Sequence, residues 1–215
     1  MGWALGESAV LGTADGGRQW QEVNPSEVPE PQYGFEGFFL DATAWLLVSA
    51  SSGSNSGMLY CTSDAGDTWQ ATQVPFAGGD LQFMDAQNGW VMADRGVAAG
   101  PQAVDIYHTA DGGQTRALVS SAGPDHPQSQ DQLPFAGNKS GISFLNDRRG
   151  WVAGYMPMIG GAYLYQTQDG GQNWSYQPLT FPPGYDQASV TTYAPTFFNQ
   201  QDGILPVYLA ADQPI

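Results

Sequence analysis

The segment Thr13-Ala-Asp-Gly-Gly-Arg-Gln-Trp20 occurs four times in this chain in slightly different forms. The other copies are TSDAGDTW (Thr62–Trp69), TADGGQTR (Thr109–Arg116) and TQDGGQNW (Thr167–Trp174). We call these four segments the motif turns. A second element, a small residue followed by tryptophan, precedes each of them: Gly2-Trp3, Ala44-Trp45, Gly89-Trp90 and Gly150-Trp151. All seven tryptophans fall into these two slots, so the repeat organises the whole chain.

The spacing of the repeat predicts the fold. The aspartates of successive motif turns are 49, 47 and 58 residues apart. A period of about 40 to 50 residues is typical of propeller blades, each of which is a small four-stranded sheet. Between the motif turns, large apolar residues alternate with variable ones, which is the pattern of half-buried strands. The sequence therefore predicts an all-β fold, a β-propeller of four-stranded antiparallel blades.

The chain holds four recognisable units and a partial fifth. We expect one propeller domain or propeller fragment over 1–215, with approximate units 1–23, 37–72, 81–118, 141–177 and 195–210. In the partial unit, Phe197 to Leu205 repeats the start of a blade with Ile204 in the tryptophan slot. This terminal segment can supply the strand that the first unit lacks and close a four-bladed ring. Alternatively the chain is a piece of a larger propeller with an open edge, which is the reading we favour.

The chemistry of the motif turns points to a structural role. Asp-Gly or Asp-x-Gly between two strands is strong hairpin chemistry, and the carboxylate can accept hydrogen bonds from N–H groups of its own turn. The second glycine provides a positive φ at little steric cost, and the closing tryptophan can pack against the neighbouring sheet. We assign a structural role to Asp15, Gly17, Trp20, Asp64, Gly66, Trp69, Asp111, Gly113, Asp169, Gly171 and Trp174.

The pattern [ST]-x-D-x-G-x-[TN]-W resembles the Asp-box, or BNR, repeat. That repeat occurs in sialidases, sortilin-type receptors, xyloglucanases and photosystem II assembly factors. The form with Gly-Trp before the motif is most similar to the assembly-factor-like subgroup. The resemblance implies a propeller over nearly the whole chain and does not identify an activity, since one propeller fold serves many functions.

Composition excludes several classes of partner. The chain has 21 acidic and 6 basic residues, a net charge of −15, which argues against nucleic acid and against anionic membrane surfaces. Cys61 is alone, so an internal disulfide is excluded. The chain as given shows no export signal and no apolar stretch long enough to span a membrane. Its low charge density suits a secreted protein, and we expect an extracytoplasmic location.

Topology divides the loops between the two ends of the strands. The motif turns and the turns before each tryptophan share one end. The second turns and the inter-blade links share the other, which we call the loop face and expect to carry the binding site. We expect Arg95 and Lys139 to be the cations of this acidic face. A sialidase needs three arginines converging on its substrate carboxylate, so this face does not fit that activity.

The leading hypothesis is a non-catalytic binding or scaffold propeller that recognises a glycan or a protein through its loop face. The ligand-binding candidates are Tyr33, Phe35, Arg95, His126, Tyr176, Phe181 and Tyr185. The alternative is a glycoside hydrolase with two carboxylates flanking a sugar bond, whose candidates are Glu27, Glu30, Asp94, Asp125, Asp131 and Asp186. The sequence predicts no cofactor and no metal site, because His126 has no second histidine nearby. A third possibility is self-association, or a partner chain, through the incomplete terminal blades.

Overall fold

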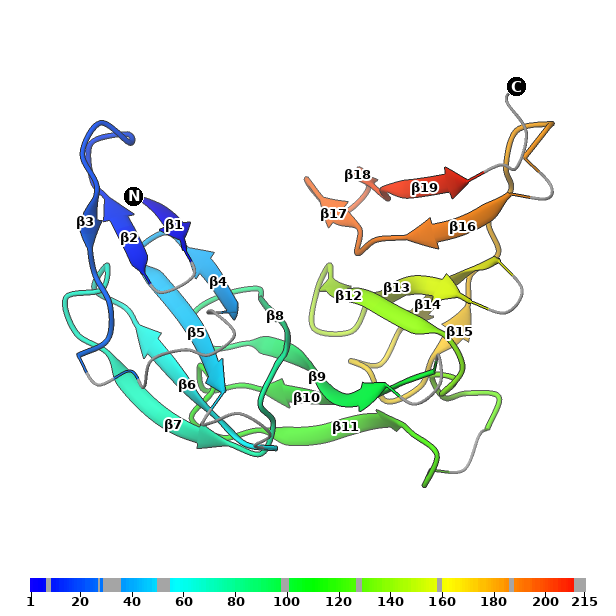
Figure 1. The fold of residues 1–215 in the computed structure, drawn as a ribbon, viewed down its shortest axis with the longest axis horizontal. Coiled ribbons are helices and arrows are strands. Elements are labelled where there is room, and N and C mark those ends of the chain that lie inside the picture. Colours follow the sequence, from blue (N-terminus) through cyan, green and yellow to red (C-terminus); the bar gives the residue numbers. More distant parts are fainter. Residues whose placement is uncertain are drawn as a thin grey trace. The chain divides into compact units, whose positions relative to one another are not determined.

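The computed structural model describes residues 1–6, 9–26, 28, 36–49, 55–97, 101–126, 129–157, 160–185 and 188–210. Every regular element in this part of the chain is a β-strand, and none is a helix (Figure 1). The three sheets between Glu36 and Tyr176 each consist of four antiparallel strands joined in sequence order. The predicted all-β fold of four-stranded propeller blades is therefore confirmed.

The strands follow the repeat closely. The first sheet contains β1 (Gly2–Leu5), β2 (Val10–Thr13) and β3 (Gln21–Glu22). The second contains β4 (Glu36–Leu40), β5 (Thr43–Ser49), β6 (Gly57–Thr62) and β7 (Gln70–Val74). The third contains β8 (Gly79–Phe83), β9 (Gly89–Val97), β10 (Gln102–Thr109) and β11 (Ala117–Ala122). The fourth contains β12 (Asn138–Phe144), β13 (Gly150–Met156), β14 (Gly161–Thr167) and β15 (Ser175–Tyr176).

The terminal strands form two short antiparallel pairs. They are β16 (Ser189–Thr192) with β19 (Val207–Ala210), and β17 (Thr196–Phe197) with β18 (Gly203–Ile204). In β17 and β18, Phe197 pairs with Gly203 and Thr196 with Ile204. This register is the same as in the third and fourth sheets. Ile204 therefore occupies the position that Trp90 and Trp151 occupy in those sheets.

The register also explains why glycine precedes tryptophan in the third and fourth units. Phe83 pairs with Gly89, and Phe144 pairs with Gly150. A Cβ on Gly89 would lie 2.3 Å from the Phe83 ring, and one on Gly150 would lie 2.6 Å from the Phe144 ring. The glycine therefore leaves the space that the phenylalanine ring of the opposite strand occupies.

A threonine hydroxyl and an aspartate carboxylate hold each motif turn together. In the fourth turn, Thr167 Oγ1 accepts the Gly171 N–H at 2.9 Å and donates to Asp169 Oδ1 at 2.9 Å. Asp169 Oδ1 also accepts the backbone N–H of Asn173 at 2.9 Å. The other three turns repeat these contacts, and Gly171 and its counterparts have φ between 87° and 99°.

The described residues divide into two compact units. Unit 1 comprises Met1–Asp94 and Tyr107–Ala117. Its main core packs Trp45, Leu47, Leu59 and Phe83 with Val74, Phe76, Leu81, Val91 and Ala93. The Trp45 and Phe83 rings stack at 3.7 Å, and the Trp45 indole N–H donates to the Gly112 carbonyl at 2.9 Å. The tryptophan slot thus joins the apolar core of unit 1 to a motif turn.

Unit 2 comprises Arg95–Ile106 and Leu118–Ile215. Its core includes the buried side chains of Val152, Tyr163, Trp174 and Val190. Thr192 is fully buried. Its hydroxyl accepts the Gly154 N–H at 3.0 Å and donates to the Tyr163 carbonyl at 2.8 Å. This threonine fastens β16 to the fourth sheet.

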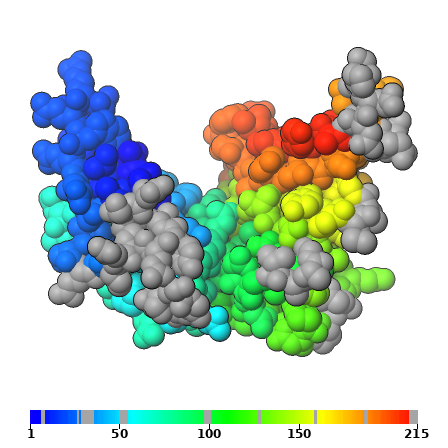
Figure 2. Space-filling model, in the orientation of Figure 1, coloured from blue at the N-terminus to red at the C-terminus, as the bar shows by residue number. Residues whose placement is uncertain are grey.

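The terminal strands expose large apolar side chains. Phe198, Ile204 and Tyr208 are 69%, 55% and 61% exposed, and Tyr193 and Val207 are also exposed. The surface of this segment is the orange and red region of Figure 2. Exposed apolar side chains that gather in one segment are typical of a surface that contacts another chain or segment.

Candidate functional site

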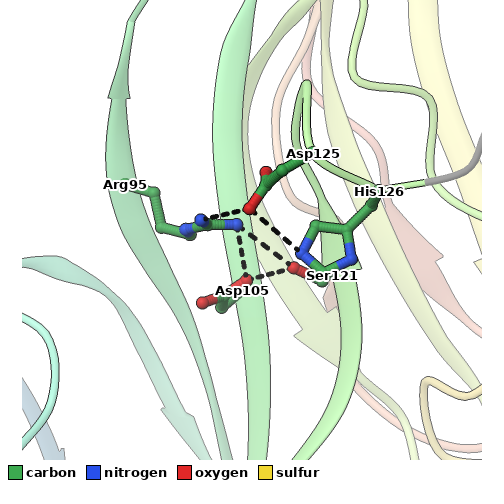
Figure 3. A network of polar contacts seen from close by, with 5 residues as sticks. All are labelled: Arg95, Asp105, Ser121, Asp125 and His126. Carbon is green, nitrogen blue, oxygen red and sulfur yellow. Dashed lines mark hydrogen bonds and ion pairs between the residues drawn. The ribbon is translucent and has the colours of Figure 1, made fainter.

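Five polar side chains of unit 2 form one network at the loop face of the third sheet (Figure 3). Arg95 Nη2 donates to Asp125 Oδ2 at 3.1 Å, and His126 Nε2 lies 3.8 Å from the same oxygen. Arg95 Nη1 lies 3.5 Å from Asp105 Oδ1 and 3.5 Å from Ser121 Oγ. The Ser121 hydroxyl donates a short hydrogen bond to Asp105 Oδ1.

The strands of the third sheet place these groups side by side. Arg95 lies near the end of β9, Asp105 on β10 and Ser121 near the end of β11, and these three strands are neighbours. The chain then turns at Gly123, whose carbonyl accepts the His126 N–H at 3.3 Å. A Cβ on Gly123 would lie 2.8 Å from Asp125 and 3.1 Å from Arg95, so glycine allows the turn to approach the guanidinium.

Exposure and charge differ across the network. The Asp105 side chain is 16% exposed, whereas the Asp125 side chain is 57% exposed. The hydrogen bond from Arg95 is the main cause that lowers the pKa of Asp125 below its usual value. Asp105 and Ser121 therefore form the inner part of the network, and Asp125 with the guanidinium presents paired charges to solvent.

The network contains serine, histidine and aspartate, yet its geometry differs from that of a nucleophilic triad. In a triad, the histidine accepts the proton of the serine hydroxyl. Here the Ser121 hydroxyl donates to the Asp105 carboxylate instead. The arrangement suits recognition by charge and hydrogen bonding better than acyl transfer.

A second acidic group belongs to unit 1. Glu36 Oε2 accepts the Gly79 N–H at 2.6 Å, at the start of β4 and β8. Burial is the main cause that raises the pKa of Glu36, and the charges of Asp80 and Asp94 raise it further. Glu36 was not among the sequence candidates, although its position as the first residue of a strand on the loop face was a usable signal.

Lys139 is not a cation of the loop face, because it is only 7% exposed. Its ammonium donates to the carbonyls of Gln102, Phe135 and Gly137 at 2.7, 2.9 and 3.2 Å, and lies 5.1 Å from the Tyr163 ring centre. Burial lowers the pKa of Lys139 to about 7. The prediction that Lys139 is a cation of the loop face was wrong, because carbonyls of the link before β12 and of Gln102 surround its ammonium.

The remaining described candidates lie at separate places. Asp94 belongs to β9 and is exposed, and Asp131 is exposed while its carbonyl accepts the Trp174 N–H at 2.8 Å. Tyr176 on β15 is 51% exposed and contacts the Tyr165 ring at 5.6 Å. The other two described aromatic candidates, both partly buried in the link after β15, are Phe181 and Tyr185.

The structure thus brings Arg95, Asp125 and His126 together, and the sequence reading missed their inner partners Asp105 and Ser121. Five further candidates lie outside the described residues: Glu27, Glu30, Asp186, Tyr33 and Phe35.

The described residues contain no group of three or more histidine, cysteine, aspartate or glutamate side chains that could hold a metal ion. They also contain no helix long and apolar enough to cross a membrane.

No protein-family model and no curated protein matches the chain. Among solved structures, the chain is similar to one described as YCF48 bound to D1 peptide. The match covers 98% of this chain and 89% of the other, with 14% sequence identity and a TM-score of 0.41.

Proposed function

We propose that this chain is a non-catalytic binding or scaffold propeller whose loop face recognises a protein or a glycan. The observation that carries the proposal is the network of Arg95, Asp105, Ser121, Asp125 and His126, which presents paired charges on a fixed sheet. Rigid strands that carry exposed polar groups at their loop ends are a common basis for recognition.

The four motif turns are, in this proposal, Asp-box repeats that hold the blades together. Their shared hydrogen bonds from the threonine hydroxyl and to the aspartate carboxylate support a structural role. The chain has a net charge of −15 although only 13% of its residues are charged, and this composition supports an extracytoplasmic location. Export of the full-length protein in its native cell, followed by fractionation, tests this location.

Binding arrays test the recognition proposal. The wild-type protein and the variants Arg95→Gln and Arg148→Gln are applied to a glycan array and a peptide array. Arg148 is a matched control, because it is an exposed arginine at the motif-turn end of the strands. We expect the wild-type protein and Arg148→Gln to give array signals and Arg95→Gln to give none. Signals on the glycan array would identify a glycan ligand, and signals on the peptide array would identify a protein ligand. Equal loss in both variants, or no signal on either array, would contradict the proposal.

A glycoside hydrolase is the second candidate, and one observation favours it. Glu36 has a raised pKa and lies within the electrostatic influence of two further carboxylates, as expected of a general acid beside a charged partner. The test is reducing-sugar release from a panel of polysaccharides at pH 4 and pH 7. Release that Glu36→Gln abolishes without loss of folding would establish hydrolysis and displace the binding-only proposal.

A further inference from the structure

The ammonium of Lys139 is a buried cation in unit 2 that is bonded to backbone carbonyls. It donates to the carbonyls of Gln102, Phe135 and Gly137, which is one acceptor for each of its three N–H groups. None of the ion pairs recorded among the described residues involves Lys139. A buried ammonium without a carboxylate is costly to desolvate. The carbonyls therefore account for its position, and the question is what these bonds hold in place.

Gln102 has the largest number of contacts with this lysine and the residues before it. Its carbonyl accepts the Lys139 ammonium at 2.7 Å, and its side-chain oxygen accepts the Lys139 backbone N–H at 2.7 Å. Its own backbone N–H donates to the Gly137 carbonyl at 3.1 Å. We call these three contacts the lysine clamp. Gln102 is the first residue of β10, and Lys139 is the second residue of β12, so the clamp ties the start of one strand to the start of the other.

The strand that the clamp holds carries the inner part of the loop-face site. Asp105 follows Gln102 by three residues on β10. Its carboxylate contacts the Arg95 guanidinium at 3.5 Å and accepts the Ser121 hydroxyl (Figure 3). The end of a strand opens more readily than its middle unless tertiary contacts hold it. The clamp supplies such contacts at the end of β10 that is nearest to Asp105.

Other contacts hold the link between β11 and β12 without touching Gln102. The Tyr163 hydroxyl donates to the Pro134 carbonyl at 2.9 Å, and the Trp174 N–H donates to the Asp131 carbonyl at 2.8 Å. Loss of either contact weakens the attachment of the link, whereas only the clamp reaches β10. The two kinds of contact can therefore be separated by substitution.

We propose that Lys139 is a positioning residue of the loop-face site, whose ammonium fixes the start of β10 and thereby holds Asp105 against the Arg95 guanidinium. This inference rests on the proposed function of that site. Lys139 does not contact the ligand, because it is buried, and it acts through Gln102 and the strand. An apolar side chain of similar length cannot replace it, since three buried carbonyls would lose their donor.

Nuclear magnetic resonance of the Arg95 side chain tests the positioning role without any ligand. The rate at which the guanidinium N–H groups exchange with water is measured in the wild type, in Lys139→Met and in Tyr163→Phe. Tyr163→Phe is the matched control, because it removes a hydrogen bond of the link and leaves the clamp intact. We expect exchange at least about threefold faster in Lys139→Met and unchanged in Tyr163→Phe, although both variants should melt at lower temperature. An unchanged rate in Lys139→Met, or equal acceleration in both variants, would overturn the proposal.

Two further variants test the route from Lys139 to Arg95. In an Asp105→Asn background, Lys139→Met should add little to the exchange rate, because the contact through which it acts is already weakened. Full additivity would refute the route through Asp105. Gln102→Leu removes the side-chain contact with the Lys139 N–H and keeps all three ammonium bonds, so it tests the clamp even if Lys139→Met fails to fold. It should accelerate the exchange in the same direction, and an unchanged rate would count against the clamp.

Binding measurements separate this inference from the proposed function. On the array that gives a wild-type signal, Lys139→Met should reduce the signal and Tyr163→Phe should retain it. Absence of any wild-type signal would contradict the proposed function, whereas the exchange rates of Arg95 would still decide whether Lys139 positions the network. Faster exchange in Lys139→Met with undiminished binding would contradict a positioning role for recognition.

Discussion

Asp169→Ala is the sharpest test of the structural role of the motif turns. The Asp169 carboxylate accepts the backbone N–H groups of Gln172 and Asn173 at 3.1 and 2.9 Å and the Asn173 side-chain amide at 2.7 Å. It also accepts the hydroxyl of Thr167, which is fully buried. Alanine removes all four bonds. The freed backbone groups are near solvent, but the buried hydroxyl loses its acceptor.

We expect a loss of about 2 kcal/mol, because each hydrogen bond contributes about 0.5–1.5 kcal/mol net and water replaces part of the set. For a domain of this size, that loss lowers the melting temperature by roughly 4–8 °C. Thermal unfolding followed by circular dichroism measures it. Asp169→Asn should lose less, because its amide oxygen can still accept the backbone N–H groups.

Asp147→Ala is the matched control, since this exposed aspartate makes no recorded side-chain hydrogen bond in the described structure. We expect its melting temperature to stay within about 1 °C of the wild type, as is usual for surface substitutions. The reasoning would be refuted if Asp169→Ala melted like Asp147→Ala. It would also be refuted if Asp169→Ala lost ligand binding while keeping the wild-type melting temperature.

Four further predictions concern stability and association. Hydrogen bonds from Thr68 and Thr115 lower the pKa values of Asp64 and Asp111 to about 2. The contribution of these two carboxylates to folding stability is therefore complete above about pH 4. It should be lost as the pH falls from 4 to 2, and urea midpoints in Asp64→Asn should fall less steeply over that range. Thr192→Val should cost about 1–3 kcal/mol in urea unfolding, because the buried Gly154 N–H loses an acceptor, whereas Thr191→Val should cost less. Burial lowers the pKa of Lys139 to about 7, so the folded protein releases this proton before the unfolded chain does, and stability should rise between about pH 7 and 10. Lys139→Met should remove that rise in urea midpoints measured across the range. Light scattering after size-exclusion chromatography should show association of the wild type that Tyr208→Ser weakens, and a monomer at all concentrations would count against an interface at the terminal strands.

Much of the local structure could be predicted because its causes are local. The turn at Asp111 needs only a threonine two residues before the aspartate and a glycine two residues after it, all within one short segment. The alternation of apolar and variable residues predicted the strands. The short connections between the strands predicted their order within each sheet. The reason for glycine before Trp90 was not visible, because it depends on the ring of Phe83 in the paired strand.

The candidate site was predicted in part. Arg95, Asp125 and His126 were expected on the loop face, and the structure brings them together. Their partner Asp105 was missed, because a strand residue gives no sequence signal that its side chain will meet an arginine ten residues away.

The sequence by itself determined the repeat, the blade-like sheets and the chemistry of the motif turns, because these depend on contacts between residues close along the chain. Only the tertiary structure decided that Lys139 is buried among the carbonyl groups of Gln102, Phe135 and Gly137. This outcome depends on which distant segments approach one another, such as Gln102 against Lys139. A local pattern specifies the strands and turns, whereas the environment of a charged side chain is set by the packing of segments far apart in sequence.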